Sequence, residues 1–324
     1  RQMCIRDRCC LAQRLGRGYC RIWHCRAHLV RPETRANARE AAFLLLRYIE
    51  QDGTFEPPRT LVGPQRLIWE LGSGVGTAGI AAARALRQAC SQEEAAVHGS
   101  TQPQEHTRAS RGPAAPMQST VVLTDLPDVC PLLRRNAASA DAHPVQLLVR
   151  PLPWGSAAAA SAIQADVGIP THILCSDLVY FPELLAPLLR TLLDITRQAP
   201  EAEVIMGYKV RSLTKEQPFW TAFGAWFDFA PVLCTEHAHN KVTFVPFGSR
   251  AAHLAHTVPA DADGCPLDDY FLLVAHRKAA TLAWAPPASD AQLLAGCYDT
   301  GHDIISGQGT DAFEWMLMCR AADS

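Results

Sequence analysis

The chain has 324 residues, of which 48% are apolar and 19% are charged, and its formal net charge is −2. This length suffices for one large domain or two modest ones, and we favour one domain with insertions. The charge balance excludes a molecule that binds polyanions over its whole surface, and the apolar content excludes a disordered acidic chain. No apolar run approaches 20 residues, so we predict no membrane-spanning segment.

Residues 1–39 differ in composition from the rest of the chain. They contain ten arginines against Asp7 and Glu33, a net charge of +8, which leaves −10 for the remainder. They also hold five of the twelve cysteines, in spacings that match no zinc-ligand pattern, so we expect no metal site and reduced thiols. We interpret the segment as a non-native end without a fold of its own. A mitochondrial transit peptide and an RNA-contacting arm are the alternatives.

The folded part is expected to begin near residue 36 with a mostly apolar helix over residues 41–49. An apolar strand over residues 66–71 then enters a glycine-rich loop, and an alanine-rich helix follows over residues 77–90. The next segment, 91–118, has no periodicity and is rich in Ser, Gln, Pro and Gly. We therefore predict that it is a surface insertion.

The glycine-rich loop follows the pattern E-x-G-x-G-x-G from Glu70 onward. Gly72, Gly74 and Gly76 permit a ligand to approach the backbone closely, and the next helix offers free N–H groups at its start. A dinucleotide site has the pattern G-x-G-x-x-G, and the Glu70 carboxylate would repel a pyrophosphate but attract an ammonium group. S-adenosylmethionine carries an ammonium group, a sulfonium and a ribose diol. We therefore predict this cofactor rather than NAD.

Two further candidate cofactor residues follow the loop. Asp125 ends an apolar strand over residues 121–125 and is placed to accept hydrogen bonds from ribose hydroxyls, unless it caps the helix that begins near Asp128. After a strand over residues 145–150, two prolines stiffen a loop that presents Trp154, whose flat ring suits the border of an adenine. The alternative is that Trp154 belongs to the ordinary core. Residues 156–170 are expected to form a second insertion, helical in part.

Strands and helices continue to alternate in the second half of the chain. We predict a strand over residues 171–180, an apolar helix over 182–193, a strand over 203–208 and a helix over 214–227. Asp177 and Tyr180 lie at the carboxyl end of the first of these strands. This alternation, with right-handed crossovers, predicts an α/β fold with a doubly wound, Rossmann-like sheet.

The end of the fold is less regular in sequence. Residues 241–247 and 270–275 are both typical of strands, and we expect them to pair antiparallel at the sheet edge, on either side of an insertion at 248–266. Residues 313–318 compete for the position of the last strand. Residues 279–324 form a C-terminal extension in this interpretation.

Four motifs occur in an order that resembles a known family. They are the Glu70–Gly76 loop, Thr124-Asp125 followed by Leu-Leu-Arg-Arg-Asn136, Pro153-Trp-Gly155, and Ser176-Asp-Leu-Val-Tyr180. Over roughly residues 40–278, the chain resembles the seven-β-strand protein-lysine methyltransferases, a group that includes yeast enzymes acting on elongation factors. The last motif is similar to the D-x-x-Y motif of the family, the most diagnostic of the four. The resemblance implies the class I methyltransferase fold, a Rossmann-like sheet of seven mostly parallel strands with helices on both faces.

The resemblance also implies roles for individual residues. The residues that would contact S-adenosylmethionine are Gly72, Ser73, Gly74, Asp125, Trp154 and Ser176. Asp177 and Tyr180 would face the acceptor lysine, and such a carboxylate and ring suit the cation that develops on the amine. The alternative for Asp177 is an N-cap before Pro182. The family often has a tryptophan in its first helix, whereas Arg39 stands at the equivalent position here.

These observations together predict a protein-lysine methyltransferase that uses S-adenosylmethionine. The expected partner is a protein substrate, such as a translation elongation factor or a chaperone, and neither a membrane nor a nucleic acid is expected as a partner. We expect a monomer in the cytoplasm, with the nucleus and the mitochondrion as alternative locations. The alternative functions are methylation of RNA or of a small molecule, and a non-catalytic binding module with the same fold.

Overall fold

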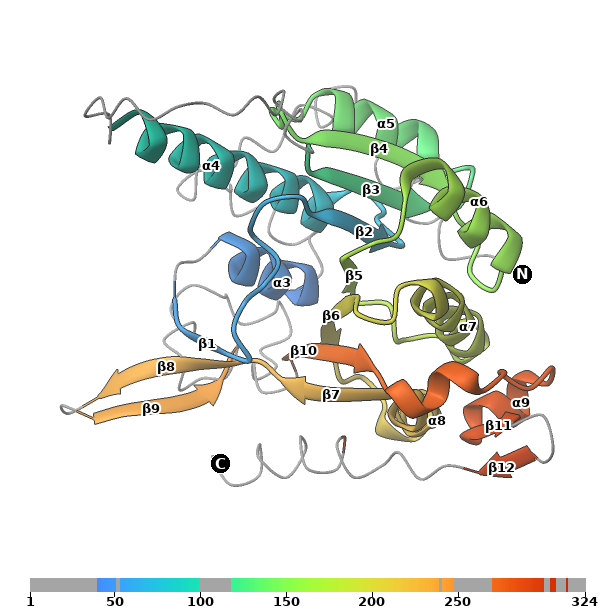
Figure 1. Cartoon of the computed structure of the whole chain (residues 1–324). Helices are drawn as coiled ribbons and strands as arrows, with labels where there is room; N and C mark the ends of the chain where they lie inside the picture. The colour runs from blue at the N-terminus through green and yellow to red at the C-terminus, as the bar shows by residue number, and fades with distance from the viewer. Residues whose placement is uncertain are drawn as a thin grey trace, which may run out of the picture.

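The computed structural model describes residues 40–50, 53–99, 118–238, 241–247, 270–299, 304–306 and 313. Its centre is a seven-stranded sheet with the order β4-β3-β2-β5-β6-β10-β7 (Figure 1). The strands are β2 (Leu67–Leu71), β3 (Thr120–Asp125), β4 (Gln146–Pro151), β5 (His172–Ser176), β6 (Glu203–Lys209), β7 (Phe227–Pro231) and β10 (Tyr270–Arg277). β10 runs antiparallel to both of its neighbours, whereas β4, β3, β2, β5 and β6 pair in parallel. The predicted α/β fold is confirmed.

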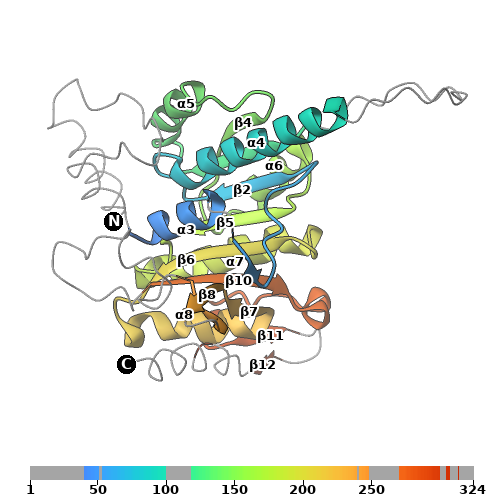
Figure 2. The same ribbon diagram turned by 90° about the vertical axis from the view of Figure 1, so that its left-hand side faces the viewer.

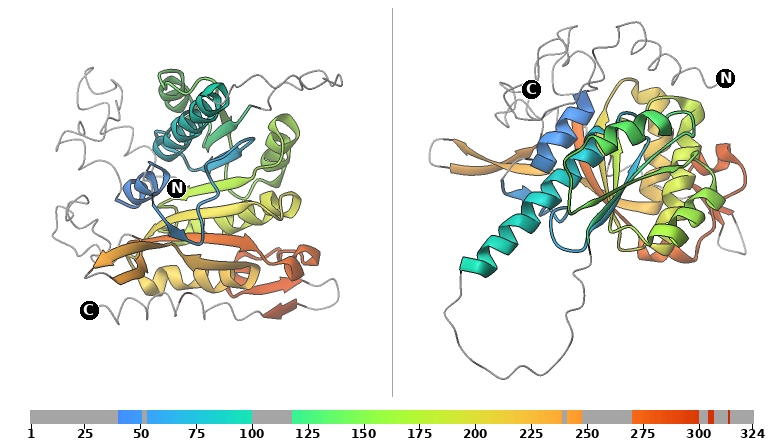
Figure 3. Two further views of the ribbon diagram at one scale, coloured as in Figure 1. Left: turned by 60° about the vertical axis from the view of Figure 1, so that its left-hand side comes forward. Right: turned by 90° about the horizontal axis from the view of Figure 1, so that it is seen from above.

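Helices cover both faces of this sheet (Figures 2 and 3). One face carries α3 (Glu40–Glu50), α4 (Thr77–Gly99) and α5 (Cys130–Ala138), and the other carries α6 (Ala157–Val167), α7 (Pro182–Gln198) and α8 (Leu213–Trp226). Along β2, alternate side chains point to opposite faces: Ile68 packs with the first set of helices, and Trp69 packs with the second. Burial on both faces explains why these strands are almost wholly apolar.

Two segments that we expected to be insertions are partly regular helix. Residues 156–170 contain α6, the crossover helix between β4 and β5, and Ser156 caps its first turn by accepting a hydrogen bond from Ala159 N–H at 3.3 Å. The helical part of that expectation is confirmed, and the helix connects two parallel strands of the main sheet; a helix rich in alanine and serine has little apolar periodicity to reveal this role in the sequence. Similarly, α4 continues to Gly99 and extends beyond the body of the fold (Figure 3).

The predicted antiparallel pair of residues 241–247 and 270–275 is wrong. β9 (Lys241–Pro246) pairs with β8 (Leu233–Ala238), and β8 pairs with β1 (Phe55–Glu56) in a separate three-stranded sheet. The β8–β9 hairpin projects from the body of the molecule (Figure 1). The partners of β10 are instead β6 and β7, and β7 follows α8 without a break in the chain. This continuity concealed β7 in the sequence.

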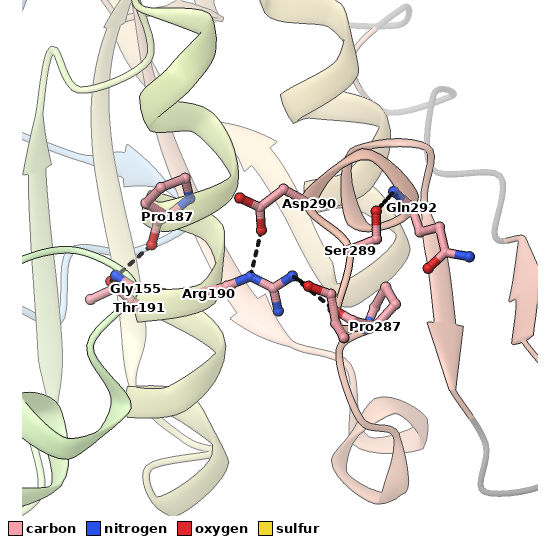
Figure 4. A network of polar contacts seen from close by, with 9 residues as sticks. Gly155, Pro187, Arg190, Thr191, Pro287, Ser289, Asp290 and Gln292 are labelled. Carbon is pink, nitrogen blue, oxygen red and sulfur yellow. Dashed lines mark hydrogen bonds and ion pairs between the residues drawn. The ribbon is translucent and has the colours of Figure 1, made fainter. Parts of the chain in front are cut away.

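The described residues of the C-terminal segment pack against α7 and α8, and none of them extends the main sheet. The segment forms a 3-10 helix (Ala279–Ala283), α9 (Asp290–Leu294), and a two-stranded sheet of β11 (Cys297–Asp299) and β12 (Ile304–Ser306). Arg190 of α7 attaches it by binding the Asp290 carboxylate at 2.8 Å and the Pro287 carbonyl at 2.7 Å (Figure 4). Phe313 is buried and stacks on Trp220 with a centroid distance of 5.3 Å, and residues 314–318 lie outside the described residues.

Several expectations concern parts of the chain that the structure does not describe. These are the N-terminal segment 1–39, which includes Arg39, and the insertion predicted at 248–266. Among the described residues, no helix combines the length and the apolar character that a membrane crossing requires.

Candidate active site

The predicted site residues lie at one edge of the sheet. β3, β2, β5 and β6 are parallel neighbours in that order, so their carboxyl ends lie side by side. The glycine loop follows β2, Asp125 ends β3, and Ser176 and Asp177 follow each other where β5 ends. Ligands of doubly wound folds bind at this edge. The fold therefore brings together residues that are up to about a hundred positions apart in the chain.

The glycine loop has the backbone conformation that its sequence predicts. Gly72, Gly74 and Gly76 have φ of +57°, +58° and +84°, a backbone region that residues with a Cβ rarely adopt. Between them, Ser73 is buried and ties the loop to β3. Its N–H donates to the Thr124 carbonyl at 2.9 Å, and its Oγ accepts from Thr124 N–H at 3.0 Å. The Ser73 side chain therefore shapes the loop from within.

The structure gives Glu70 a different role from the predicted contact with an ammonium group. Only 2% of the residue is exposed, and its Oε2 accepts a hydrogen bond from Gly79 N–H in the first turn of α4 at 3.1 Å. The strand alternation explains this, because Glu70 points to the same face as Ile68, toward α4. Burial raises the pKa of the Glu70 carboxyl to about 7, although the bond from Gly79 acts in the opposite direction.

Glu70 is expected to make the stability of the protein depend on pH. Because its pKa is raised in the folded state, the folded protein keeps a proton that the unfolded chain loses between about pH 4.5 and pH 7. The free energy of unfolding therefore falls as pH rises through this window. We expect Glu70→Gln to remove this contribution, roughly 2–4 kcal/mol over the window. Urea denaturation of the wild type and of Glu70→Gln at pH 5, 6, 7 and 8 measures the difference. The same dependence of the free energy of unfolding on pH in the two proteins would contradict the prediction.

Asp125 holds the glycine loop and faces the edge of the site. Its Oδ2 accepts a hydrogen bond from Gly74 N–H, and its Oδ1 accepts one from Leu126 N–H, both at 2.7 Å. The alternative of a helix cap is wrong, because the N-cap of α5 is Val129. Each carboxylate oxygen can accept more than one hydrogen bond, which is the property that recognition of ribose hydroxyls requires.

Trp154 lies beside the glycine loop and is half-buried. A Cβ placed on Gly72 would lie 2.9 Å from the indole Cζ2, so the ring and the loop are in close contact. The next residue, Gly155, donates its N–H to Thr191 Oγ1 of α7 at 2.8 Å (Figure 4). This bond attaches the Pro-Trp-Gly loop to α7 and so positions the indole.

Asp177 has the most constrained environment of the predicted residues. Its φ is +57°, its N–H donates to the Gly207 carbonyl at 2.7 Å, and it is 2% exposed. The N-cap of α7 is Phe181, so the capping alternative for Asp177 is wrong. Tyr180 is half-buried in the same loop, and its ring lies 4.6 Å from that of Phe181.

The sequence analysis did not identify Arg211, although it contacts Asp177. Nη2 of Arg211 lies 2.7 Å from each carboxylate oxygen of Asp177. The residues are 34 positions apart, on the segments that follow the neighbouring strands β6 and β5. The signal in the sequence was the position of Arg211 three residues after a predicted strand.

Comparison with known families confirms the predicted resemblance. A family model described as lysine methyltransferase matches residues 111–224, which run from the segment before β3 to within α8 and include Asp125, Trp154, Asp177 and Tyr180. Over the residues that it covers, this match supports a methyltransferase that uses S-adenosylmethionine. The match lies after the glycine loop, so it does not itself test the predicted role of that loop.

The chain also resembles several solved methyltransferase structures, with low sequence identity and low TM-scores. An O-methyltransferase family protein from Burkholderia thailandensis is 12% identical with a TM-score of 0.39, covering 76% of this chain, which spans 58% of that protein. Precorrin-6y C5,15-methyltransferase from Geobacter metallireducens is 12% identical with a TM-score of 0.34, over 78% and 90% of the two chains. TomG from Streptomyces achromogenes, solved with the cofactor, is 12% identical with a TM-score of 0.33, over 74% and 80%. These scores support no argument about the substrate.

The residues of the site fit S-adenosylmethionine. The Oγ of Ser176 is buried and makes no hydrogen bond with the described residues, so a ligand that reached it would supply the missing partner. The glycine loop is bare of side chains at Gly72 and Gly74, with the Asp125 carboxylate and the Trp154 indole on either side. A carboxylate suits the ribose hydroxyls and an indole suits the adenine ring.

Proposed function

We propose that the methyltransferase acts on the side chain of a lysine in a protein. The observation that carries this proposal is the buried carboxylate of Asp177, which directly follows Ser176 and lies three residues before Tyr180. An acid at this position suits an amine acceptor, which becomes cationic during the reaction. The family match, described as lysine methyltransferase, supports the same acceptor.

Methyl transfer to a lysine nitrogen requires mainly that the amine and the methyl group are correctly positioned. When bound, S-adenosylmethionine supplies an electrophilic methyl group, and its sulfur keeps the electron pair of the broken S–C bond. The lysine must arrive uncharged, because the attack uses the lone pair of its nitrogen. Asp177 orients the amine and stabilises the positive charge that develops on it, and the ring of Tyr180 borders that charge. Asp125 at the end of β3 and Ser176 at the end of β5 would hold the cofactor, on either side of the glycine loop that follows β2.

Exposed apolar side chains around this edge support a protein as the acceptor. Val75, Phe181 and Leu213 are 48%, 37% and 44% exposed, and they follow the adjacent strands β2, β5 and β6. They are three of the five large apolar side chains that are exposed among the described residues. Because all three lie on the segments that follow the strand ends of the site, we infer that they contribute to a surface that binds another protein.

Replacing Phe181 or Leu213 by serine is expected to weaken the docking of the protein substrate. Each change removes an apolar anchor, so KM for the substrate protein should rise about fivefold, with little effect on kcat. Steady-state kinetics with that protein measures both constants. Ile169→Ser is the matched control, because Ile169 is 52% exposed but precedes β5, at the opposite edge of the sheet. An equal rise of KM in the control would argue against this docking surface.

A labelling experiment tests the proposed acceptor. The purified methyltransferase is incubated with S-[methyl-³H]-adenosylmethionine and a cell lysate, and the labelled protein is analysed by mass spectrometry for methyl-lysine. We expect a labelled protein, with an elongation factor or a chaperone as the first candidates, and we expect label to be lost with Asp177→Asn. Asp166→Asn is the control, because this acid is exposed and paired with Arg150 away from the site. Label found only in RNA or in small molecules would overturn the proposal.

We also propose that the enzyme acts as a monomer in the cytoplasm. Sedimentation of the purified protein and microscopy of the tagged protein test these two statements.

A further inference from the structure

The carboxylate of Asp177 is already paired with a cation that belongs to the enzyme. Both oxygens lie 2.7 Å from Nη2 of Arg211, whose side chain is 34% exposed while that of Asp177 is 1% exposed. The pair therefore lies at the boundary between the core and the surface, at the place where the acceptor is expected. We propose that Arg211 is a positioning residue, which holds the Asp177 carboxylate in place and offsets its charge so that the acceptor lysine binds uncharged.

Arg211 is itself held by a buried network behind the site. Its N–H donates to Glu216 Oε2 of α8 at 3.2 Å, and its Nη1 donates to the Lys209 carbonyl at 3.3 Å. Glu216 is buried, and the same oxygen accepts a hydrogen bond from the Tyr208 hydroxyl at 2.6 Å. Burial raises the pKa of Tyr208 far above its usual range, so this hydroxyl stays a donor. The backbone at Arg211 is thus fixed from β6 and α8.

The charge of the pair decides which form of lysine is favoured at the site. A carboxylate without a counter-ion would raise the pKa of a neighbouring amine and hold it as the ammonium form, which has no lone pair to attack with. Next to Arg211, the negative charge of Asp177 is offset, so the penalty for losing the lysine proton is smaller. The carboxylate still offers oxygen lone pairs that orient the amine and accept a hydrogen bond from it.

Other charged and titratable groups around the pair do not take over this role. Glu216 is occupied by Tyr208 and by the backbone of Arg211, and the ammonium group of Lys209 lies 4.7 Å from the centre of the Tyr270 ring. Tyr180 lies on the loop that carries Asp177, and Glu70 and Asp125 belong to the strands on the cofactor side. Arg211 is a charged partner of Asp177, at 2.7 Å.

The test compares pH profiles of Arg211→Gln, Arg211→Lys and the wild type. The substrate is the purified protein that the wild-type enzyme labels, because this inference rests on the proposed lysine activity. With Arg211→Gln, we expect kcat at pH 7.5 to fall at least tenfold and the inflection of the kcat profile to move up by about one pH unit or more. Arg211→Lys keeps the charge and should restore the inflection, although with a lower rate because the planar fork is lost.

Binding supplies a second measurement that does not depend on turnover. In the presence of S-adenosylhomocysteine, the dissociation constant of the substrate protein at pH 7.5 should be equal or lower with Arg211→Gln, because the unpaired carboxylate attracts the ammonium form. A loss of kcat with retained binding separates this role from a merely structural one. Lys215→Gln, which removes an exposed cation of α8 near Arg211, is the control and should leave the profile unchanged.

Three outcomes would overturn the inference. They are an unchanged inflection in Arg211→Gln, an equal displacement in Lys215→Gln, and a faster reaction of Arg211→Gln at every pH, which would mean that Arg211 blocks the acceptor place. If Arg211→Gln does not fold, Arg211→Lys alone tests the inference. An inflection of its kcat profile that moves up by about one pH unit or more, although the positive charge is kept, would overturn the inference. Failure of the proposed function is distinguishable, because the wild-type enzyme would then label no protein.

Discussion

Replacing Asp177 by asparagine is expected to lower kcat for methyl transfer by about 100-fold. The change keeps the size of the side chain but replaces one carboxylate oxygen by an NH₂ group, which removes an acceptor that orients the amine and breaks the charged pair with Arg211. Asparagine also tolerates the φ of +57° at this position, so the fold should be retained. Steady-state kinetics with labelled cofactor measures the loss, and thermal unfolding of the variant checks its stability.

The affinity for the cofactor separates this effect from general damage to the site. Asp177 belongs to the acceptor side in our proposal, so the dissociation constant of S-adenosylmethionine, measured by calorimetry, should change less than about threefold. Asp166→Asn should leave all of these quantities unchanged. A variant of Asp177 that keeps full activity would remove the carboxylate from the proposed mechanism.

Replacing Gly72 by alanine is expected to damage both the fold and the cofactor site. The new Cβ would lie 2.9 Å from the Trp154 indole and 3.0 Å from Leu178, at a residue with a φ of +57°. We expect the free energy of unfolding to fall by roughly 2–4 kcal/mol, from backbone strain together with overpacking. Displacement of the loop and of the indole should weaken S-adenosylmethionine binding by about tenfold or more.

Gly53→Ala is the matched control for this substitution. A Cβ at Gly53 would lie 3.4 Å from the Phe55 ring, an ordinary contact, and Gly53 lies outside the glycine loop. Its effect on unfolding should be within about 0.5 kcal/mol, with unchanged affinity for the cofactor. Urea denaturation and calorimetry compare the two variants. Equal effects of the two changes would show that the conformation of Gly72 is not what the cofactor site requires.

Most of the sheet was predictable from the sequence. The strands that became β2, β3, β4 and β6 were placed within one residue at each end, because buried parallel strands are short apolar runs bounded by turn residues. Errors arose where local pattern is weak. The helix α6 is rich in alanine, and β7 continues directly from α8. Pairing of strands in the last third of the chain depends on contacts between distant residues, and the predicted pair there was wrong.

The sequence by itself indicated the family resemblance, the cofactor and the candidate residues, because the glycine loop, Asp125 and the Ser176–Tyr180 motif are each continuous stretches of chain. Only the tertiary structure decided what several of these residues contact. The side chain of Glu70 binds α4, and Asp177 is paired with Arg211, which the sequence analysis had not identified. The physical reason is that a motif specifies which groups lie at a strand end, whereas their partners depend on which strands are neighbours and which face each side chain joins.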